Sequence, residues 1–476
     1  MSQHAQLSLA IADVPHHNQR LFSDYFLNHI LPKEEPWHTA WQQLQSEAEP
    51  VMKQLQQLDA SFTPNPKNEA QTEEDWIRPI LRILNHLFEV QVPLKVPDGT
   101  QRPDYFFYQD EAARIANKNK KVLTEEDVHQ RAFAVGDAKA WELPLDRTQT
   151  GKSSDPFSNK NPSYQIFFYM LHSGLPWGIL TNGRYWRLYH TETAHKLEIF
   201  YEVDLPALLA TSDEASFLYF YAFFRREAFE PGPLALERML LASTEYAQGI
   251  SEGLRQQVYD ALRYVAQGFL DYSENKLHSS PETNKRIYDN SLILLYRLLF
   301  ILYAEARDLL PLQENRAYYR KYSLHAIKHD VVNELRDGLL LPTSDTFWSR
   351  LKHLFKAINQ GNPPLNVNTF NGGLFDPERH TFLEQYTVDD VNLCRAIDKL
   401  ARVNGQFVDY RDLAERHLGT IYEGLLEYTL HVATEAMVEL RSTSKIVPAQ
   451  NVPRKDIANT FRAGDVYLAT DRGERS

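Results

Sequence analysis

The sequence predicts an α/β domain followed by a mostly α-helical region. Between residues 70 and 205, short aromatic or apolar runs typical of strands alternate with stretches of helical periodicity. After about residue 210 the strand signal fades and apolar residues recur at helical spacing. Asn182-Gly183 stands between two β-rich runs, and this dipeptide favours a tight hairpin in which both turn residues have positive φ.

Length and composition narrow the classes of protein that fit. The 476 residues are 43% hydrophobic and 24% charged, which is typical of a globular protein with about three domains. A single cysteine, Cys394, excludes a disulfide framework and a cysteine-built zinc site, and it fits a reducing cytoplasm. The net charge of −12 argues against a protein that coats nucleic acid with its whole surface, but it leaves room for a local basic groove.

No membrane span or signal peptide is expected. Residues 1–20 lack a basic start and a sustained apolar run. The most apolar stretches are Phe217–Phe224, with eight residues, and Leu292–Ala304, which Arg297 interrupts; both fall short of the roughly 20 residues that a span needs. We expect both stretches to be buried helices of a cytoplasmic protein.

Composition and periodicity divide the chain into four segments. Residues 1–60 are expected as a polar helical segment, 61–210 as the α/β domain, 211–440 as the helical domain, and 441–476 as a polar tail. The Pro-rich stretch Ser61–Lys67 marks the first boundary.

The α/β domain has these expected elements, in order along the chain: a helix at Glu73–Phe88, a strand at Asp104–Tyr108, a charged helical excursion at Asp110–Gln130, a strand at Ala132–Ala138, a helix at Ser163–Leu171, and strands at Trp177–Thr181 and Arg184–His190. The expected helices of the helical domain are Phe217–Arg226, Leu234–Phe269, Asn290–Asp308, Val331–Leu340, Phe347–Asn359, Val388–Val403 and Asp412–Thr434.

Asp104, Asp137 and Lys139 form the strongest candidate site. Arg102-Pro103-Asp104 opens one predicted strand and Asp137-Ala138-Lys139 closes the other. Residues i and i+2 of a strand share a face, so Asp137 and Lys139 point together, and Asp104 joins them if the strands are neighbours. Two carboxylates and a backbone carbonyl suit Mg²⁺, and the lysine could orient or deprotonate a water or stabilise a charged phosphate. The same residues also fit a solvated strand end with an ion pair.

Glu73 is a further candidate ligand. It lies three and four residues before Trp76 and Ile77, so it is on the apolar face of its helix. A buried carboxylate is costly unless it has a charged or hydrogen-bonding partner, and a metal ion could be that partner. The alternative is an acidic residue in the first turn of a helix, which the helix dipole favours.

Gln165 and Tyr169 are the last candidates. Their i, i+4 spacing puts both on one face of a helix, where they could hold the lysine or a DNA phosphate. Ordinary packing of an aromatic helix explains the same pair. Elsewhere, Arg225-Arg226 and the pair Lys352 and Lys356 are too sparse to define a DNA-binding patch.

Taken together, these residues resemble the PD-(D/E)xK nuclease core. The helix with Glu73, the strand with Pro103-Asp104, the strand with Asp137-x-Lys139 and the helix with Gln165-x-x-x-Tyr169 stand in the family's order, and the last motif resembles the RecB- and Mrr-like branches. The resemblance implies metal ligands at Glu73, Asp104 and Asp137, a catalytic lysine at Lys139, and Gln165 and Tyr169 in support.

A wider resemblance covers roughly residues 65–476. Phrases at Trp177–Trp186, Leu294–Glu305, Asn371–Phe375 and, most specifically, Leu418–Glu427 are similar to the amino-terminal half of type IIG restriction–modification enzymes and related phage-defence proteins. In that family a helical connector joins the nuclease to an adenine methyltransferase and then to a target-recognition domain. The passage Gly464–Ser476 is similar to the run-up to the methyltransferase, so that part is absent from this chain and we carry over no methyltransferase activity. The chain is then a truncation, a natural split subunit or a remnant with another use.

The resemblance implies a metal-dependent DNA endonuclease that uses Mg²⁺, with Mn²⁺ as a substitute, on double-stranded DNA. A separate methyltransferase and specificity partner would restrain it. A single metal site per chain would, in its simplest form, require two copies to cut both strands, and the sequence leaves open whether they meet. A catalytically silent nuclease-fold scaffold that docks such a methyltransferase is the alternative. A self-sufficient nuclease that attacks foreign or modified DNA is a third hypothesis.

Overall fold

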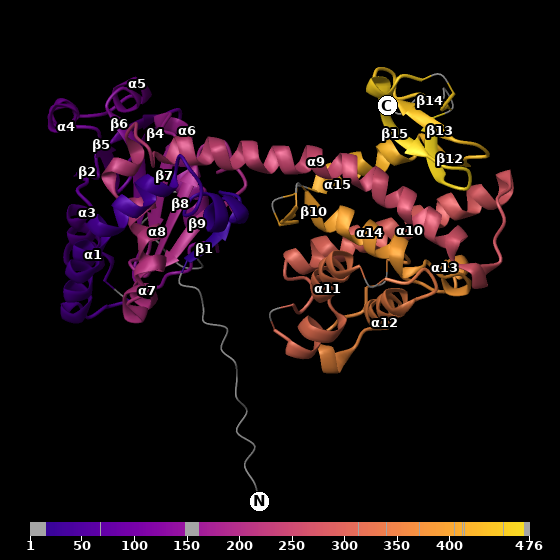
Figure 1. Ribbon diagram of the computed structural model, residues 1–476. Helices are drawn as coiled ribbons and strands as arrows, with labels where there is room; N and C mark the ends of the chain where they lie inside the picture. Colours follow the sequence, from indigo (N-terminus) through magenta and orange to yellow (C-terminus); the bar gives the residue numbers. More distant parts are fainter. Residues whose placement is uncertain are drawn as a thin grey trace, which may run out of the picture. The chain divides into compact units, whose positions relative to one another are not determined.

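The computed structural model describes residues 16–66, 68–147, 161–312, 314–338, 340–370, 372–403, 405–411, 413, 415–450 and 452–470. The chain divides into two compact units, Met1–Tyr246 and Ala247–Ser476 (Figure 1). A mixed sheet with helices on it makes up the first unit, and the second is mostly helical. The predicted α/β class is therefore confirmed.

The first unit is built around a seven-stranded sheet with the order β1-β9-β8-β7-β6-β5-β2. Neighbouring strands are antiparallel except β6 and β7, which run parallel. A parallel pair needs a crossover connection, and α6 lies in the chain between these two strands. The strands are β1 (His16–Gln19), β2 (Leu87–Val90), β5 (Tyr105–Tyr108), β6 (Ala132–Ala138), β7 (Trp177–Thr181), β8 (Tyr185–His190) and β9 (Phe200–Asp204), with a separate hairpin of β3 (Leu94–Val96) and β4 (Gly99–Gln101).

The helices of the first unit are η1 (Phe26–Ile30), α1 (His38–Ser61), α2 (Glu69–Thr72), η2 (Glu73–Ile77), α3 (Arg78–Ile83), α4 (Glu111–Lys118), α5 (Glu125–His129), α6 (Pro162–Ser173), α7 (Leu205–Thr211), α8 (Glu214–Phe224), η3 (Arg226–Phe229) and the start of α9 (Leu236–Asp271). The charged segment Asp110–Gln130 is confirmed as a helical excursion, since it carries α4 and α5.

Both faces of the sheet are buried, and β5 shows how. Tyr105 and Phe107 belong to an apolar cluster on one face, whereas Phe106 and Tyr108 belong to a cluster on the other. Side chains alternate between the faces of a strand, so a strand covered on both sides reads as a continuous aromatic run. The first of these faces carries α1, η2, α3 and α8, and the second carries α6.

Two predicted elements differ in detail. The helix expected at Glu73–Phe88 ends with α3 at Ile83, and Leu87 and Phe88 lie in β2. Asn85, with a φ of 63°, breaks the chain between them, because a left-handed residue cannot continue the helix. An apolar run of this length fits a buried helix or a strand equally well, so periodicity alone did not separate them.

The hairpin at Asn182-Gly183 is confirmed, but its turn is not the one expected. Gly183 has a φ of 84°, and Asn182 is not among the residues with positive φ. Asn182 N donates to Tyr185 O at 3.3 Å, so Gly183 and Arg184 are the two turn residues. The Asn182 side chain instead accepts hydrogen bonds from the backbone N–H groups of Arg184 and Tyr185, at 3.1 and 2.7 Å.

The segment 1–60 takes part in the first unit through its described residues. Strand β1 pairs with β9 along four residues, and α1 contributes Trp41, Leu44 and Leu55 to the buried cluster under the sheet. Residues 1–15 lie outside the described part of the chain.

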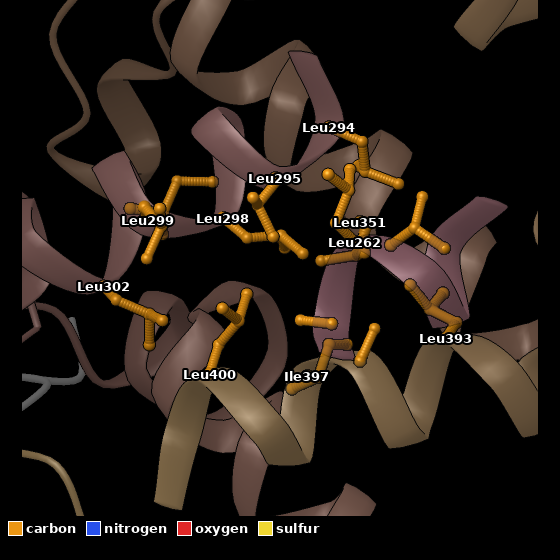
Figure 2. Close-up of a cluster of buried hydrophobic side chains, with 14 of the residues drawn as sticks. Leu262, Leu294, Leu295, Leu298, Leu299, Leu302, Leu351, Leu393, Ile397 and Leu400 are labelled. Carbon is orange, nitrogen blue, oxygen red and sulfur yellow. The ribbon is translucent and has the colours of Figure 1, made fainter. Parts of the chain in front are cut away.

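The second unit has an apolar core made by α9, α10, α11, α12 and α14. Figure 2 shows Leu295 and Leu298 of α10 pointing toward Ile397 and Leu400 of α14. Its elements are η4 (Ser273–Asn275), α10 (Pro281–Ala306), η5 (Tyr318–Tyr322), α11 (Leu324–Asp337), α12 (Thr346–Gln360), η6 (Pro363–Leu365), α13 (Thr381–Gln385), α14 (Asp390–Ala401), β10 (Arg402–Val403), β11 (Gln406–Phe407), α15 (Glu415–Leu425), β12 (Tyr428–Val432), β13 (Met437–Leu440), β14 (Ile446–Pro448), η7 (Arg454–Asp456), β15 (Ile457–Phe461) and β16 (Val466–Thr470).

One described helix has the length and composition of a membrane span. It is α10, in which an 18-residue window has a mean hydropathy of 1.4, and 67% of that window is buried inside the protein. Arg297, in the middle of α10, is itself 1% exposed. The burial agrees with the expectation of a core helix for this stretch.

The carboxy-terminal part contains strands where the sequence predicts a helix end and a polar tail. The helix expected at Asp412–Thr434 gives way after Leu425 to β12, which pairs with β16. Three further short strands form a second small sheet, β14-β13-β15. Residues 471–476 lie outside the described part of the chain.

A glycine in β7 sets how closely α6 approaches the sheet. A Cβ on Gly178 would lie 2.5 Å from Met170 Sδ and 2.9 Å from Ile166 Cγ1, both on α6. We expect Gly178→Ala to destabilise the first unit by about 1–3 kcal/mol, because overpacking at a close contact costs that much. Urea unfolding followed by tryptophan fluorescence measures it, since six of the seven tryptophans precede residue 247.

Gly232→Ala is the matched control. A Cβ there would meet only Glu230 O, at 4.0 Å, so its stability should stay within about 0.5 kcal/mol of the wild type. Equal stability of the two variants would contradict the close approach of α6 to β7.

Candidate active site

Two neighbouring strands bring Asp104 and Asp137 to the same end of the sheet. Asp104 directly precedes β5, and Asp137 is the second-last residue of β6. The antiparallel register pairs Tyr105 with Gly136, so one step further along both strands sets Asp104 opposite Asp137. Asp104 Oδ2 also accepts a hydrogen bond from Ala138 N at 2.8 Å. The structure thus brings together the two carboxylates that the sequence pairs.

Lys139 completes this group. Its Nζ lies 2.5 Å from Asp137 Oδ2, and the two side chains are 17% and 3% exposed. Lys139 N donates to Thr181 O of β7 at 2.8 Å, which continues the β6–β7 pairing one residue past the end of β6. Val135 packs with α6, and alternation along the strand puts Asp137 and Lys139 on the same face.

The charges in this group are out of balance. Burial raises the pKa of Asp104 well above its ordinary value, and the like charge of Asp137 adds to the effect, against the attraction of Lys139. Burial alone would lower the pKa of Lys139, but attraction to Asp137 and Asp104 outweighs it, so the net pKa is raised. Two carboxylates therefore share one partly buried ammonium group.

Glu73 approaches the site from the other face of the sheet. Its side chain is buried, and its Oε2 accepts hydrogen bonds from Tyr105 Oη at 2.6 Å and from Arg78 Nη2 at 3.3 Å. Its charge contributes to the raised pKa of Asp104, so the two carboxylates are electrostatic neighbours. Glu73 lies where the sequence expected a buried acid, and Tyr105 and Arg78 are its partners here.

Glu69 is a site residue that the sequence reasoning missed. Its Oε2 accepts a hydrogen bond from Ala140 N at 3.0 Å, next to Lys139. Desolvation raises the pKa of the Glu69 carboxyl group, and attraction to Lys139 opposes that rise. Repulsion from Asp137 and Glu73 raises the pKa further. The available signal was its spacing of four residues from Glu73, which puts both acids on one side of a helix.

Gln165 and Tyr169 are both buried on α6, the helix that covers the face carrying Lys139. Tyr169 belongs to the apolar cluster with Val135 and Leu180, which fits a packing role for its ring. Both side chains take part in further interactions, so neither is free. Their predicted role beside the lysine stays a prediction.

The site carries carboxylate oxygens, the type of ligand that Mg²⁺ prefers. Asp137 Oδ2 is buried and has no aligned hydrogen bond, with Lys139 Nζ as its charged neighbour. Within the described ranges, no three side chains of His, Cys, Asp or Glu lie close enough together to hold a metal ion. Mg²⁺ is nevertheless commonly held by one or two carboxylates, with waters and substrate phosphates as its other ligands. Asp104 and Asp137 meet that smaller requirement.

No family model, curated protein or solved structure matches the chain. Function must therefore be argued from the geometry and chemistry of the site itself.

We expect Mg²⁺ to raise the melting temperature of the first unit, because Asp104 and Asp137 would hold the cation and its charge would relieve their repulsion. At about 100 times its dissociation constant, a ligand of the folded state adds roughly 2.7 kcal/mol. Asp104→Asn should abolish this gain without lowering the melting temperature in EDTA, since an amide oxygen can still accept from Ala138 N. Differential scanning calorimetry with and without Mg²⁺ measures both quantities.

Asp75→Asn is the matched control, because Asp75 is an exposed acid on η2. It should keep the full response to Mg²⁺. An equal response in the wild type and in Asp104→Asn would show that the metal binds elsewhere.

Proposed function

We propose that this chain is a Mg²⁺-dependent DNA endonuclease subunit that hydrolyses phosphodiester bonds. The observation that carries the proposal is the convergence of Asp104, Asp137 and Lys139 at the ends of two paired strands. A structural ion pair does not need a second carboxylate beside its single cation, whereas two neighbouring carboxylates suit a metal-dependent phosphodiester site.

The order of elements supports the finer assignment to the PD-(D/E)xK fold. The acidic helical segment with Glu73, the strand after Asp104, the strand ending at Asp137-Ala138 and the helix with Gln165 and Tyr169 all belong to one compact unit. These are the four parts on which the resemblance to the nuclease core rests.

In this proposal Asp104 and Asp137 hold the metal, and Ala138 N fixes the orientation of Asp104. Bound Mg²⁺ would supply Lewis-acid chemistry, which polarises a phosphoryl oxygen and lowers the pKa of a water. Lys139 presents a partly buried positive charge beside the carboxylates, where it would stabilise the negative charge that grows on the phosphate in the transition state. Glu69 lies within electrostatic reach of Lys139, so it is suited to orienting the ammonium group or a water.

The wider resemblance extends the proposal to partners. We propose that the helical part of the chain couples cleavage to a separate methyltransferase that recognises the DNA sequence. Since the candidate site has one set of ligands, two copies of the chain would be needed to cut both strands in the simplest scheme.

A catalytically silent scaffold is the second candidate. The observation that favours it is Glu73, whose carboxylate binds Tyr105 and Arg78 rather than joining Asp104 and Asp137. Such a protein would keep the nuclease fold and dock a methyltransferase without cutting DNA.

Cleavage of supercoiled plasmid separates the two candidates. With Mg²⁺ or Mn²⁺, Asp137→Ala should reduce cutting to background, because it removes a metal ligand. Lys139→Ala should slow cutting by roughly 100-fold, as loss of one charge-stabilising group does in other enzymes. Glu69→Gln and Glu73→Gln, measured in parallel, show which acid takes part.

Asp75→Asn should cut at the wild-type rate, and calorimetry of every variant shows whether it is folded. The plasmid is supplied both unmodified and adenine-methylated, and each reaction is repeated with a candidate methyltransferase partner. Absence of cutting by the folded wild type in all of these conditions would favour the scaffold.

A further inference from the structure

Two sequence stretches of the second unit carry basic residues and no acids. Between Glu314 and Asp330 every charged residue is basic, and the same holds between Asp345 and Asp376. The chain as a whole has a net charge of −12, so these stretches differ from their surroundings. The first contains η5 and the second contains α12.

The structure packs these two elements against each other. Helices η5 and α12 are in contact, and Tyr318 of η5 is buried in the same apolar cluster as Trp348 and Leu351 of α12. The turn before η5 is tied to the turn after α12, because Asn315 Nδ2 donates to Pro364 O at 3.0 Å. Cations that are more than twenty residues apart along the chain are thereby gathered on neighbouring elements.

Five of these cations form what we call the basic face: Arg316, Arg320, Lys321, Lys352 and Lys356. On α12, Lys352 and Lys356 are four residues apart and so share one side of the helix. Arg320 and Lys321 of η5 are exposed, as are Arg316, which precedes η5, and Lys356. Lys352 is partly exposed. The structure has no acid within ion-pair distance of any of the five among its described residues, whereas their neighbour Arg350 pairs with Asp330 at 2.8 Å.

We infer that the basic face binds the phosphate backbone of double-stranded DNA. Lysine and arginine side chains without acidic partners, gathered on neighbouring elements, attract a polyanion, and release of its counterions drives the binding. Tyr319, beside Arg320, is 42% exposed and offers a hydroxyl group to phosphate oxygens, which side-chain hydroxyls commonly contact. The contact is to the backbone, so it holds DNA without reading its sequence.

This inference does not depend on cleavage. Binding is therefore measured in EDTA, by fluorescence anisotropy of a labelled duplex, with the full chain and a series of KCl concentrations. Lys352→Ala/Lys356→Ala and Arg320→Ala/Lys321→Ala should each raise the dissociation constant roughly 10-fold or more near 0.1 M salt. Each should lower the slope of log K against log salt by about 2, which is the expected loss for two phosphate contacts.

The matched control is Lys285→Ala/Lys455→Ala, which removes two exposed lysines of the same unit and changes the net charge equally. It should leave affinity and slope unchanged. Equal losses in all three double variants, or no loss in any, would overturn the inference, as would tighter binding of the wild type to single-stranded RNA than to duplex DNA. Because binding is measured in EDTA, where the proposed nuclease site has no metal, loss of binding in these variants is distinguished from loss of cleavage.

Discussion

The ion pair between Asp137 and Lys139 is the interaction on which the candidate site depends. Removing two charges from water is costly, and their mutual attraction rarely repays more than that cost. Here the pair is also held by backbone hydrogen bonds, because Lys139 N donates to Thr181 O and Ala138 N donates to Asp104 Oδ2. Three neighbouring strands thus fix the positions of the charged groups. Because Asp104 adds a second carboxylate to the pair of Asp137 and Lys139, the group as a whole carries an excess of negative charge.

A comparison within the same sheet shows why this excess matters. Arg187 of β8 and Glu202 of β9 also form a half-buried ion pair, and the guanidinium group stacks on Phe200 at 4.1 Å. In that pair one carboxylate balances one guanidinium group, and the ring of Phe200 packs on the guanidinium group. The pair therefore stabilises the contact between strands β8 and β9. The group around Lys139 has Asp104, Asp137 and the nearby Glu69 for a single base. Arrangements in which charged groups are placed at the expense of local stability are concentrated at functional sites.

The sequence predicts the elements that carry strong periodicity or aromatic runs. It does not predict elements or contacts that depend on pairing with distant parts of the chain. Strands β5 and β6 and helix α6 are found where expected, and so is the convergence of Asp104 with Asp137. Strand β1, with the sequence His16-His17-Asn18-Gln19, has no apolar alternation, because it is held at the sheet edge by backbone pairing with β9. Glu69 was missed for a related reason: its place beside Lys139 depends on the chain reversal that brings α2 to the end of β6.

The same argument explains how an acidic chain can present a basic face. Along the sequence, Lys352 and Lys356 have few charged neighbours, so the local charge does not indicate a basic patch. The contact between η5 and α12 adds the three cations of residues 316–321, which are distant in sequence. Because the screening length at physiological salt is about 8 Å, DNA near this face responds mainly to these five charges rather than to the chain's total of −12. The negative charge elsewhere on the chain then lowers the affinity for DNA without preventing contact at this face.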